Sequence, residues 1–93
     1  MIRSFRDRRT QALFEGREVP QFRALAEQAA RRLTMLDRAR ALGDLAAVPG
    51  NRLEALRGDR QGQYSIRVNR QWRVCFEWRS DGPYNVEIVD YHG

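Results

Sequence analysis

The sequence predicts an α+β fold in which two N-terminal helices pack on one face of a small antiparallel β-sheet. Apolar residues recur about every 3.6 positions in the first half of the chain and at every second position in the last third. Closely spaced turn residues break the last third into short segments, which is typical of hairpins. With 93 residues, the chain has the size of one domain, which we expect to span residues 1–93.

The first helix follows residues 2–5, which allow a short first strand. Asp7 precedes the helix as a capping residue, because a side-chain oxygen at this position accepts a hydrogen bond from a free N–H of the first turn. We expect the helix to run to about Glu15. It should stop at Gly16, since glycine adopts left-handed dihedral angles readily.

The second helix begins at Pro20, which suits a first turn because it has no N–H to satisfy. Its apolar positions recur at steps of three and four residues, and the pattern fades beyond Arg40. These positions are Phe22, Leu25, Ala26, Ala29, Leu33 and Leu36. Residues 41–51 contain glycines and a proline, and they indicate a loop with a short helical piece at residues 44–47.

Alternation of apolar and polar residues predicts the strands of the sheet, at residues 64–69, 72–78 and 84–91. The connecting turns fall at residues 69–71 and 80–83, and residues 53–57 allow one more strand before the first hairpin. One face of the sheet holds Tyr64, Ile66, Val68, Trp72, Val74, Phe76, Trp78, Val86 and Ile88. We interpret its aromatic members Trp72, Phe76 and Trp78 as core residues rather than base-stacking platforms.

Charge indicates the class of partner. Lysine is absent, so all 17 basic residues are arginine, and against 12 acidic residues they leave a formal net charge of +5. Guanidinium groups stay charged at any physiological pH and bind phosphates through paired N–H bonds. The composition therefore favours a polyanionic partner.

Two further features restrict the setting. No apolar run is long enough to span a bilayer, and the N-terminus lacks the apolar core of a signal peptide, so we expect a cytoplasmic protein without a membrane partner. Cys75 is the only cysteine, which excludes an internal disulfide and fits a reducing compartment. Its place in an alternating strand favours inert packing over a nucleophilic role.

Strand register brings reactive side chains to one end of the predicted sheet. The first turn places Arg67 opposite Arg73 with both side chains on one face, where like charges repel. The second turn returns Asp90 and Tyr91 beside Arg73, and His92 follows directly. A slip of one residue would send the arginines and Tyr91 to different faces.

Such a group suits metal-free cleavage of RNA. The reaction removes a proton from a ribose 2′-OH, stabilises negative charge at phosphorus and protonates the departing 5′ oxygen. Aspartate, histidine and tyrosine can transfer the protons, and arginines can stabilise the charge. We expect no cofactor and no zinc cluster, because the single histidine and single cysteine stand apart from scattered acids.

A purely structural interpretation of these residues also stays open. Arg67 and Arg73 would then be solvated surface residues, and Asp90 would be an ion-pair partner of Arg73. His92 would be a frayed terminal residue. Constellations of this size arise often by chance.

Several motifs extend from one end of the chain to the other: Ile2-Arg3-Ser4-Phe5, Leu13-Phe14-Glu15, Leu53-x-x-Leu56-Arg57-Gly58-Asp59-Arg60-x-Gly62-x-Tyr64-Ser65-Ile66, Trp72-Arg73-Val74-x-Phe76 and Asp90-Tyr91-His92. Together they resemble the HigB branch of the RelE/ParE toxin superfamily. The resemblance implies a RelE-like fold and a ribosome-dependent endoribonuclease that cuts mRNA in the decoding site. It also implies a HigA-like antitoxin with a helix-turn-helix DNA-binding domain, whose complex with the toxin represses its own operon by binding operator DNA.

Carried over by position, the resemblance assigns catalysis to Arg73, Asp90 and Tyr91, with His92 in the same terminal motif. The expected RNA and phosphate contacts are Arg57, Arg60, Arg67, Asn69 and Arg70.

Three positions depart from the pattern of the family. Arg57 stands where relatives often have lysine, and Gln71 stands where some have asparagine. Glu54 stands where some have histidine. The change at Glu54 removes a candidate base and adds negative charge near the substrate path, so we expect weaker or differently specific cleavage.

Two other functional classes remain open from the sequence. One is a non-catalytic inhibitor with the same fold, such as the ParE-type toxins that poison DNA gyrase. The other is a plain nucleic-acid-binding or protein-binding module that uses the basic face alone. The acidic and phenolic terminus beside Arg73 favours cleavage, because simple binding does not require an acid there.

Overall fold

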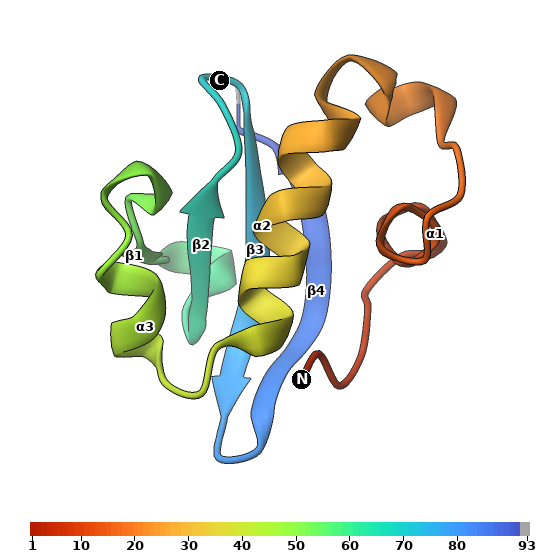
Figure 1. Ribbon diagram of the computed structural model, residues 1–93. Coiled ribbons are helices and arrows are strands. Elements are labelled where there is room, and N and C mark those ends of the chain that lie inside the picture. The colour runs from red at the N-terminus through yellow and green to blue at the C-terminus, as the bar shows by residue number, and fades with distance from the viewer. Residues whose placement is uncertain (92–93) are drawn as a thin grey trace.

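The computed structural model describes residues 1–91, which form helices over one face of a β-sheet (Figure 1). Within this range the sheet has four strands in sequence order, with every neighbouring pair antiparallel. They are β1 (Glu54–Ala55), β2 (Gln63–Arg67), β3 (Trp72–Arg79) and β4 (Gly82–Asp90). The predicted α+β class is confirmed, and the additional strand at residues 53–57 is present as the short β1.

The first predicted helix is α1 (Arg8–Phe14). It stops as expected at Gly16, whose φ of 88° is left-handed. Asp7 occupies the capping position, but its side chain makes no capping hydrogen bond. Its Oδ2 accepts instead from Arg9 Nε at 3.3 Å, so the predicted cap is wrong in its chemistry.

The second predicted helix starts differently from the prediction. Residues Pro20–Leu25 form a 3₁₀ helix, η1, and the α-helix α2 covers only Ala26–Arg38. Side chains three residues apart align in a 3₁₀ helix, and this directs both Phe22 and Leu25 into the core. The short helical piece expected in the following loop is α3 (Leu42–Ala46), and the 3₁₀ turn η2 (Pro49–Asn51) follows it.

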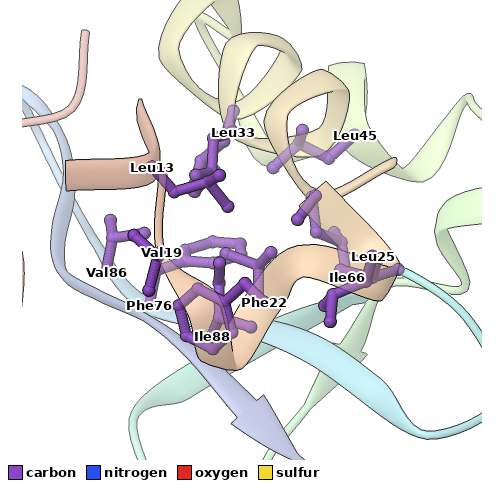
Figure 2. Close-up of a cluster of buried hydrophobic side chains, with 14 of the residues drawn as sticks. Leu13, Val19, Phe22, Leu25, Leu33, Leu45, Ile66, Phe76, Val86 and Ile88 are labelled. Carbon is purple, nitrogen blue, oxygen red and sulfur yellow. The ribbon is translucent and has the colours of Figure 1, made fainter. Parts of the chain in front are cut away.

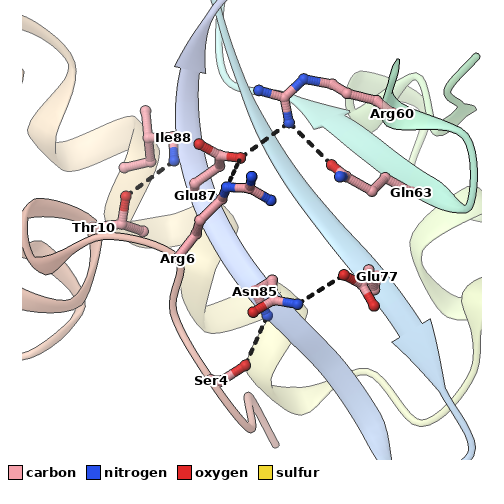
Figure 3. Close-up of polar contacts among 9 residues, drawn as sticks. All are labelled: Ser4, Arg6, Thr10, Arg60, Gln63, Glu77, Asn85, Glu87 and Ile88. Carbon is pink, nitrogen blue, oxygen red and sulfur yellow. Dashed lines mark hydrogen bonds and ion pairs between the residues drawn. The ribbon is translucent and has the colours of Figure 1, made fainter. Parts of the chain in front are cut away.

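The N-terminal segment runs parallel to β4 and covers the outer edge of that strand. Phe5 forms a bridge with Val86, and Val86 N donates to Ser4 O at 3.1 Å. Further along, Ile88 N donates to Thr10 Oγ1 at 3.0 Å (Figure 3). The predicted first strand is therefore reduced to one bridge, yet it still satisfies the edge of the sheet.

The apolar core lies between the helices and the side of the sheet that faces them (Figure 2). Trp72 packs edge-on against Phe22 with ring centroids 5.7 Å apart, and Trp78 lies at the margin of the same cluster. The interpretation of the strand aromatics as core is confirmed. The buried members include Leu13, Val19, Phe22, Leu25, Leu33, Leu45, Ile66, Val74, Phe76, Val86 and Ile88.

The opposite side of the sheet, here called the outer face, carries the polar residues of the alternating pattern. The register places Glu54, Ser65, Cys75 and Glu87 in one cross-strand row and Arg67, Arg73 and Val89 in the next.

A β-bulge in β4 decides which side chains reach the outer face near the end of that strand. The pairing of β3 with β4 shifts by one residue between Cys75 and Glu77. β4 takes up the extra residue beside Asn85, whose φ is 54° and whose side-chain amide donates to Glu77 Oε2 at 2.7 Å (Figure 3). Without the extra residue, alternation would turn Tyr91 toward the opposite side of the sheet.

Candidate active site

Arg73 is the second residue of β3, and it is buried on the outer face with 8% of its surface exposed. Its Nε donates to Ser65 Oγ at 2.7 Å. Its Nη2 donates to the carbonyl oxygens of Arg52 at 2.6 Å and Ser65 at 3.3 Å. These bonds fix the plane of the guanidinium in advance of any ligand. The interpretation of Arg73 as a solvated surface residue is wrong.

One edge of this guanidinium is left for a ligand. Among the described residues, Arg73 Nη1 makes no hydrogen bond, and its charged neighbour is Glu54 Oε1 at 3.5 Å. The Glu54 side chain is 58% exposed and belongs to the short edge strand β1. A phosphate oxygen that approaches Nη1 therefore meets the carboxylate of Glu54. Arg73 forms an ion pair with Glu54, which the sequence did not predict.

Arg67 lies directly opposite Arg73 across β2 and β3, as predicted. The two like charges repel, and the side chains use different partners. Arg73 reaches toward Arg52 and β1, whereas Arg67 Nε donates to Asn69 O at 3.1 Å in the turn. Within residues 1–91 no hydrogen bond uses the Nη groups of Arg67, so they can reach a second phosphate.

Asn69 shapes the turn between β2 and β3. Its Oδ1 accepts from Gln71 N at 2.8 Å and from Trp72 N at 2.9 Å, which is the typical geometry of an asparagine turn. The oxygen is thereby occupied, and the Nδ2 group is the part of the side chain that a ligand can use. Arg70 is exposed at the tip of the turn.

Arg60 belongs to the 3₁₀ turn η3 (Gly58–Arg60) and reaches over the middle of the outer face (Figure 3). Its Nη1 donates to Gln63 Oε1 and Glu87 Oε2, both at 3.0 Å. Arg6 also pairs with Glu87 Oε2, at 3.4 Å. The hydrogen bond that Arg60 donates to Glu87 raises the pKa of Arg60 above its ordinary value, with weaker electrostatic contributions that include Tyr91.

Cys75 is fully buried on the outer face, between the rows that hold Arg73 and Glu77. Loss of solvent raises the pKa of its thiol to about 11, although Arg60 and Arg73 oppose the shift. The thiol is therefore neutral near pH 7, and the predicted packing role agrees with this burial.

The end of β4 returns to the start of β3, as the register predicted. Asp90 pairs with Trp72, and its Oδ2 accepts from Gln71 Nε2 at 3.0 Å. Tyr91 N donates to Gln71 O at 2.7 Å, and 44% of Tyr91 is exposed. By alternation Tyr91 shares the face of Arg73, whereas Asp90 lies at the same end of the sheet with the parity of Trp72. The acid, phenol and arginines thus meet at one end but are divided between two faces.

The remaining predicted site residues are exposed or lie beyond the described range. Arg57 is exposed, and in the part of the chain that the structure describes it forms no ion pair. His92 lies outside the described residues. The described residues contain no group of histidine, cysteine and acidic side chains that would suit a metal ion. None of the helices in residues 1–91 has the length and apolar character needed to cross a bilayer.

Sequence reasoning missed the residues that hold Arg73 in place. The alternation that puts Arg67 on the outer face also puts Ser65 there. This shared face could have predicted that the Ser65 hydroxyl lies near Arg73. The carbonyl of Arg52 has no side-chain signal, since it is presented by a residue with a left-handed φ of 45°. The bond from Gln71 to Asp90 was also missed, because it depends on the bulge that sets the register.

Comparison with known proteins places the chain in one family. The model for HigB-like toxins, described as RelE-like toxin of type II toxin-antitoxin system HigB, matches residues 3–92. The chain is 33% identical over 97 aligned residues to Endoribonuclease HigB of Proteus vulgaris, covering 99% of this chain and 100% of that protein. It is 47% identical over 62 residues to Toxin HigB-1 of Vibrio cholerae. That alignment covers 67% of this chain and 64% of the toxin, so the chain spans less than two thirds of the length of that relative. The chain belongs to the HigB family of RelE-like toxins from type II toxin-antitoxin systems.

Proposed function

We propose that this toxin cleaves messenger RNA on the ribosome and thereby stops translation. The observation that carries the proposal is the Arg73 guanidinium, which is buried and oriented by the protein but leaves one edge toward the outer face. Tyr91, an exposed phenol, shares that face. The Proteus vulgaris relative is named an endoribonuclease, and the alignment covers its full length.

The proposed chemistry is transesterification within the RNA strand. A base removes the proton of a ribose 2′-OH, the 2′ oxygen attacks phosphorus, and the bond from phosphorus to the 5′ oxygen breaks. An acid then protonates the departing oxygen, which leaves a 2′,3′-cyclic phosphate and a 5′-hydroxyl. Arg73 Nη1 binds the non-bridging oxygen that gains charge, and its fixed orientation minimises reorganisation at that step.

We assign proton transfer to the terminal motif. Tyr91 lies on the face of Arg73, and Asp90 is positioned at the same end by the amide of Gln71. His92 belongs to the same motif and remains a candidate acid or base. The order in which these groups act has to be established with single-residue variants, because ionisable groups that interact do not titrate independently.

The RNA backbone is proposed to follow the arginines around this end of the sheet. Arg67, Arg57 and Arg70 supply phosphate contacts, and Asn69 contributes through Nδ2. Arg60 takes part by holding η3 against Glu87, so its effect on RNA is mainly one of position. Because the site is open, the ribosome supplies the alignment of the 2′-OH with phosphorus.

A type II toxin has an antitoxin partner. We propose that this partner is a HigA-like protein with a helix-turn-helix domain, and that the complex binds operator DNA through that domain. The site of action is then the cytoplasm, where translating ribosomes are found. Coexpression with the antitoxin encoded beside this gene should restore growth.

The direct experiment adds the purified protein to translating ribosomes and maps new 5′ ends on the message. We expect cleavage within the coding sequence by the wild type and its loss in the Asp90→Ala variant. Intact message with wild type and variant indistinguishable would overturn the proposal. DNA-damage signalling with intact message would instead identify a gyrase inhibitor.

A further inference from the structure

A pocket of about 540 Å³ opens at the edge of the sheet, between β1 and the loop that leads into β2. It is lined by residues 55–57 and 61–64. Its volume lies in the range of roughly 300–1,000 Å³ that is typical of small-ligand sites. None of the catalytic residues discussed above lines it, and Arg57 is the one proposed phosphate contact among its walls.

The walls of this pocket carry three kinds of group that recognise RNA bases. Tyr64 is half-buried, and one side of its ring stacks on Phe76, with centroids 6.3 Å apart and an angle of 27°. Within residues 1–91 no hydrogen bond uses the Tyr64 hydroxyl. Gln61 offers an exposed amide, which can both donate and accept, and Arg57 offers an exposed guanidinium. Single-stranded RNA is commonly bound by stacking on aromatic rings, with hydrogen bonds to the free edges of the bases.

Gly62, in the loop that leads into β2, forms an open wall of the pocket. Gly62 lines the pocket and has a left-handed φ of 95°. A Cβ built at Gly62 would meet no described atom within 4 Å, so this wall consists of bare backbone beside open space. The loop is anchored on its far side by Arg60, which binds Gln63 and Glu87.

The pocket adjoins the candidate active site through two successive rungs of the β1–β2 ladder. Glu54, the ion-pair partner of Arg73, pairs with Ser65, and the next rung pairs Ala55 with Tyr64. Successive rungs point to opposite faces and are about 3.3 Å apart along the strand. Because β1 is the edge strand, a single strand of RNA that rounds this edge can place a phosphate near Glu54 and Arg73 on the outer face and a base near Tyr64 on the other side.

We propose that this pocket, here called the edge pocket, is a nucleobase subsite that stacks one unpaired base of the RNA on Tyr64. The identity of the base is read by the amide of Gln61, while Arg57 holds the adjoining phosphate. The subsite rests on the proposed RNA cleavage, to which it adds a choice of sequence. It selects one nucleotide of the message near the site of cleavage.

The test measures binding of a 2′-O-methylated tetraribonucleotide, which has no 2′-OH to deprotonate and so cannot be cleaved. The matched ligands are four tetranucleotides, each of which lacks the base at one position but keeps the whole backbone. We expect the wild type to bind at least one of the four singly abasic ligands about tenfold more weakly than the intact one, as loss of one stacked base implies. Tyr64→Leu should lose this preference and Tyr64→Phe should keep it. Tyr84→Leu, on β4 at the opposite edge of the sheet from β1, should match the wild type.

Amide resonances provide a readout that does not depend on any variant folding. In the wild type, the N–H signals of Gln61 and Gly62 should shift on addition of the intact tetranucleotide, and less with the abasic ligand that binds most weakly. Equal binding of intact and abasic ligands, or shifts that spare residues 61–64, would overturn the subsite. Failure of the wild type to cut ribosome-bound message is a separate result, which would overturn the proposed cleavage and not the measured base preference.

Discussion

The two faces of the sheet are both closely packed, but different forces hold them. On the side toward the helices, Ile66, Val74 and Phe76 are fully buried among apolar side chains. On the outer face, Arg73 and Cys75 are nearly as hidden, yet Arg73 is enclosed by hydrogen bonds and an ion pair. Burying a charged group costs several kcal/mol unless such partners compensate it.

This contrast separates the part of the molecule that stabilises the fold from the part that we propose carries out chemistry. The helix-facing side is explained by apolar burial alone. Holding a guanidinium on the outer face requires a hydroxyl, two carbonyls and a carboxylate in exact register. A charged group kept under such conditions is a candidate for function, because simpler packing would stabilise the fold equally well.

The largest expected effect tests the helix-facing side. Phe76→Ala removes a fully buried ring and should lower the free energy of unfolding by about 3–5 kcal/mol, measured by urea denaturation. Val89→Ala, on the outer face and only half-buried, is the matched control and should lower it by roughly 1 kcal/mol or less. Equal losses from the two variants would remove the distinction between the faces.

The second effect concerns the thiol buried on the outer face. The pKa of Cys75 is raised to about 11 in the folded protein, so the folded state holds the thiol proton more tightly than the unfolded state does. The protonated thiol should therefore contribute its full stabilisation below about pH 9, and this stabilisation should be lost as the pH rises toward about 11. Between these pH values the wild type should lose about 2 kcal/mol more unfolding free energy than Cys75→Ala does. A pH-independent difference between the two proteins would show that burial does not perturb the thiol.

The turn between β2 and β3, which connects Arg67 to Arg73, should give a smaller effect on stability. Asn69→Ala leaves the N–H groups of Gln71 and Trp72 without their side-chain acceptor, and should cost about 1–2 kcal/mol of unfolding free energy. Arg70→Ala, one residue further along the exposed tip, should change the stability by less than about 0.5 kcal/mol. If the two variants unfold at the same urea concentration, the asparagine does not organise the turn.

The smallest effect sharpens the comparison within the outer face itself. Glu54→Gln removes the carboxylate that faces Arg73 Nη1, and RNA should then bind about threefold more tightly at low salt. The gain should shrink as salt rises, because Glu54 is largely exposed. Glu27→Gln removes a comparable exposed ion pair with Arg31 on α2 and should leave RNA binding unchanged. Weaker binding by Glu54→Gln would mean that this carboxylate assists the substrate.

The sequence predicted the parts of the fold that depend on repeated local patterns. The three-and-four spacing from Phe22 to Leu36 located the second helix, and period-two alternation located the hairpin that pairs Arg67 with Arg73. Turn residues placed the end of β4 beside the start of β3. These features follow from side-chain spacing, so no tertiary information was needed to find them.

The features that the sequence did not predict depend on contacts between separate segments of the chain. The start of the second helix became 3₁₀ where the core draws in both Phe22 and Leu25. The bulge beside Asn85 is stabilised by Glu77 on the adjacent strand and by Ser4, which lies far from it in the sequence. That bulge decides that Tyr91, and not Asp90, shares the face of Arg73, and no local sequence pattern predicts it. The burial of Arg73 likewise depends on the backbone of Arg52.

Our central claim is that the oriented guanidinium of Arg73, and not positive charge in general, supports cleavage. It is tested most directly by comparing Arg73→Lys with Arg67→Lys, its cross-strand partner, in cleavage of message on translating ribosomes. Lysine keeps the charge but loses the planar fork, so Arg73→Lys should cut at least about 100-fold more slowly. Arg67→Lys, whose proposed role is a simple phosphate contact, should stay within about threefold of the wild type. Circular dichroism should show both variants folded. Equal activity of the two variants would contradict the claim.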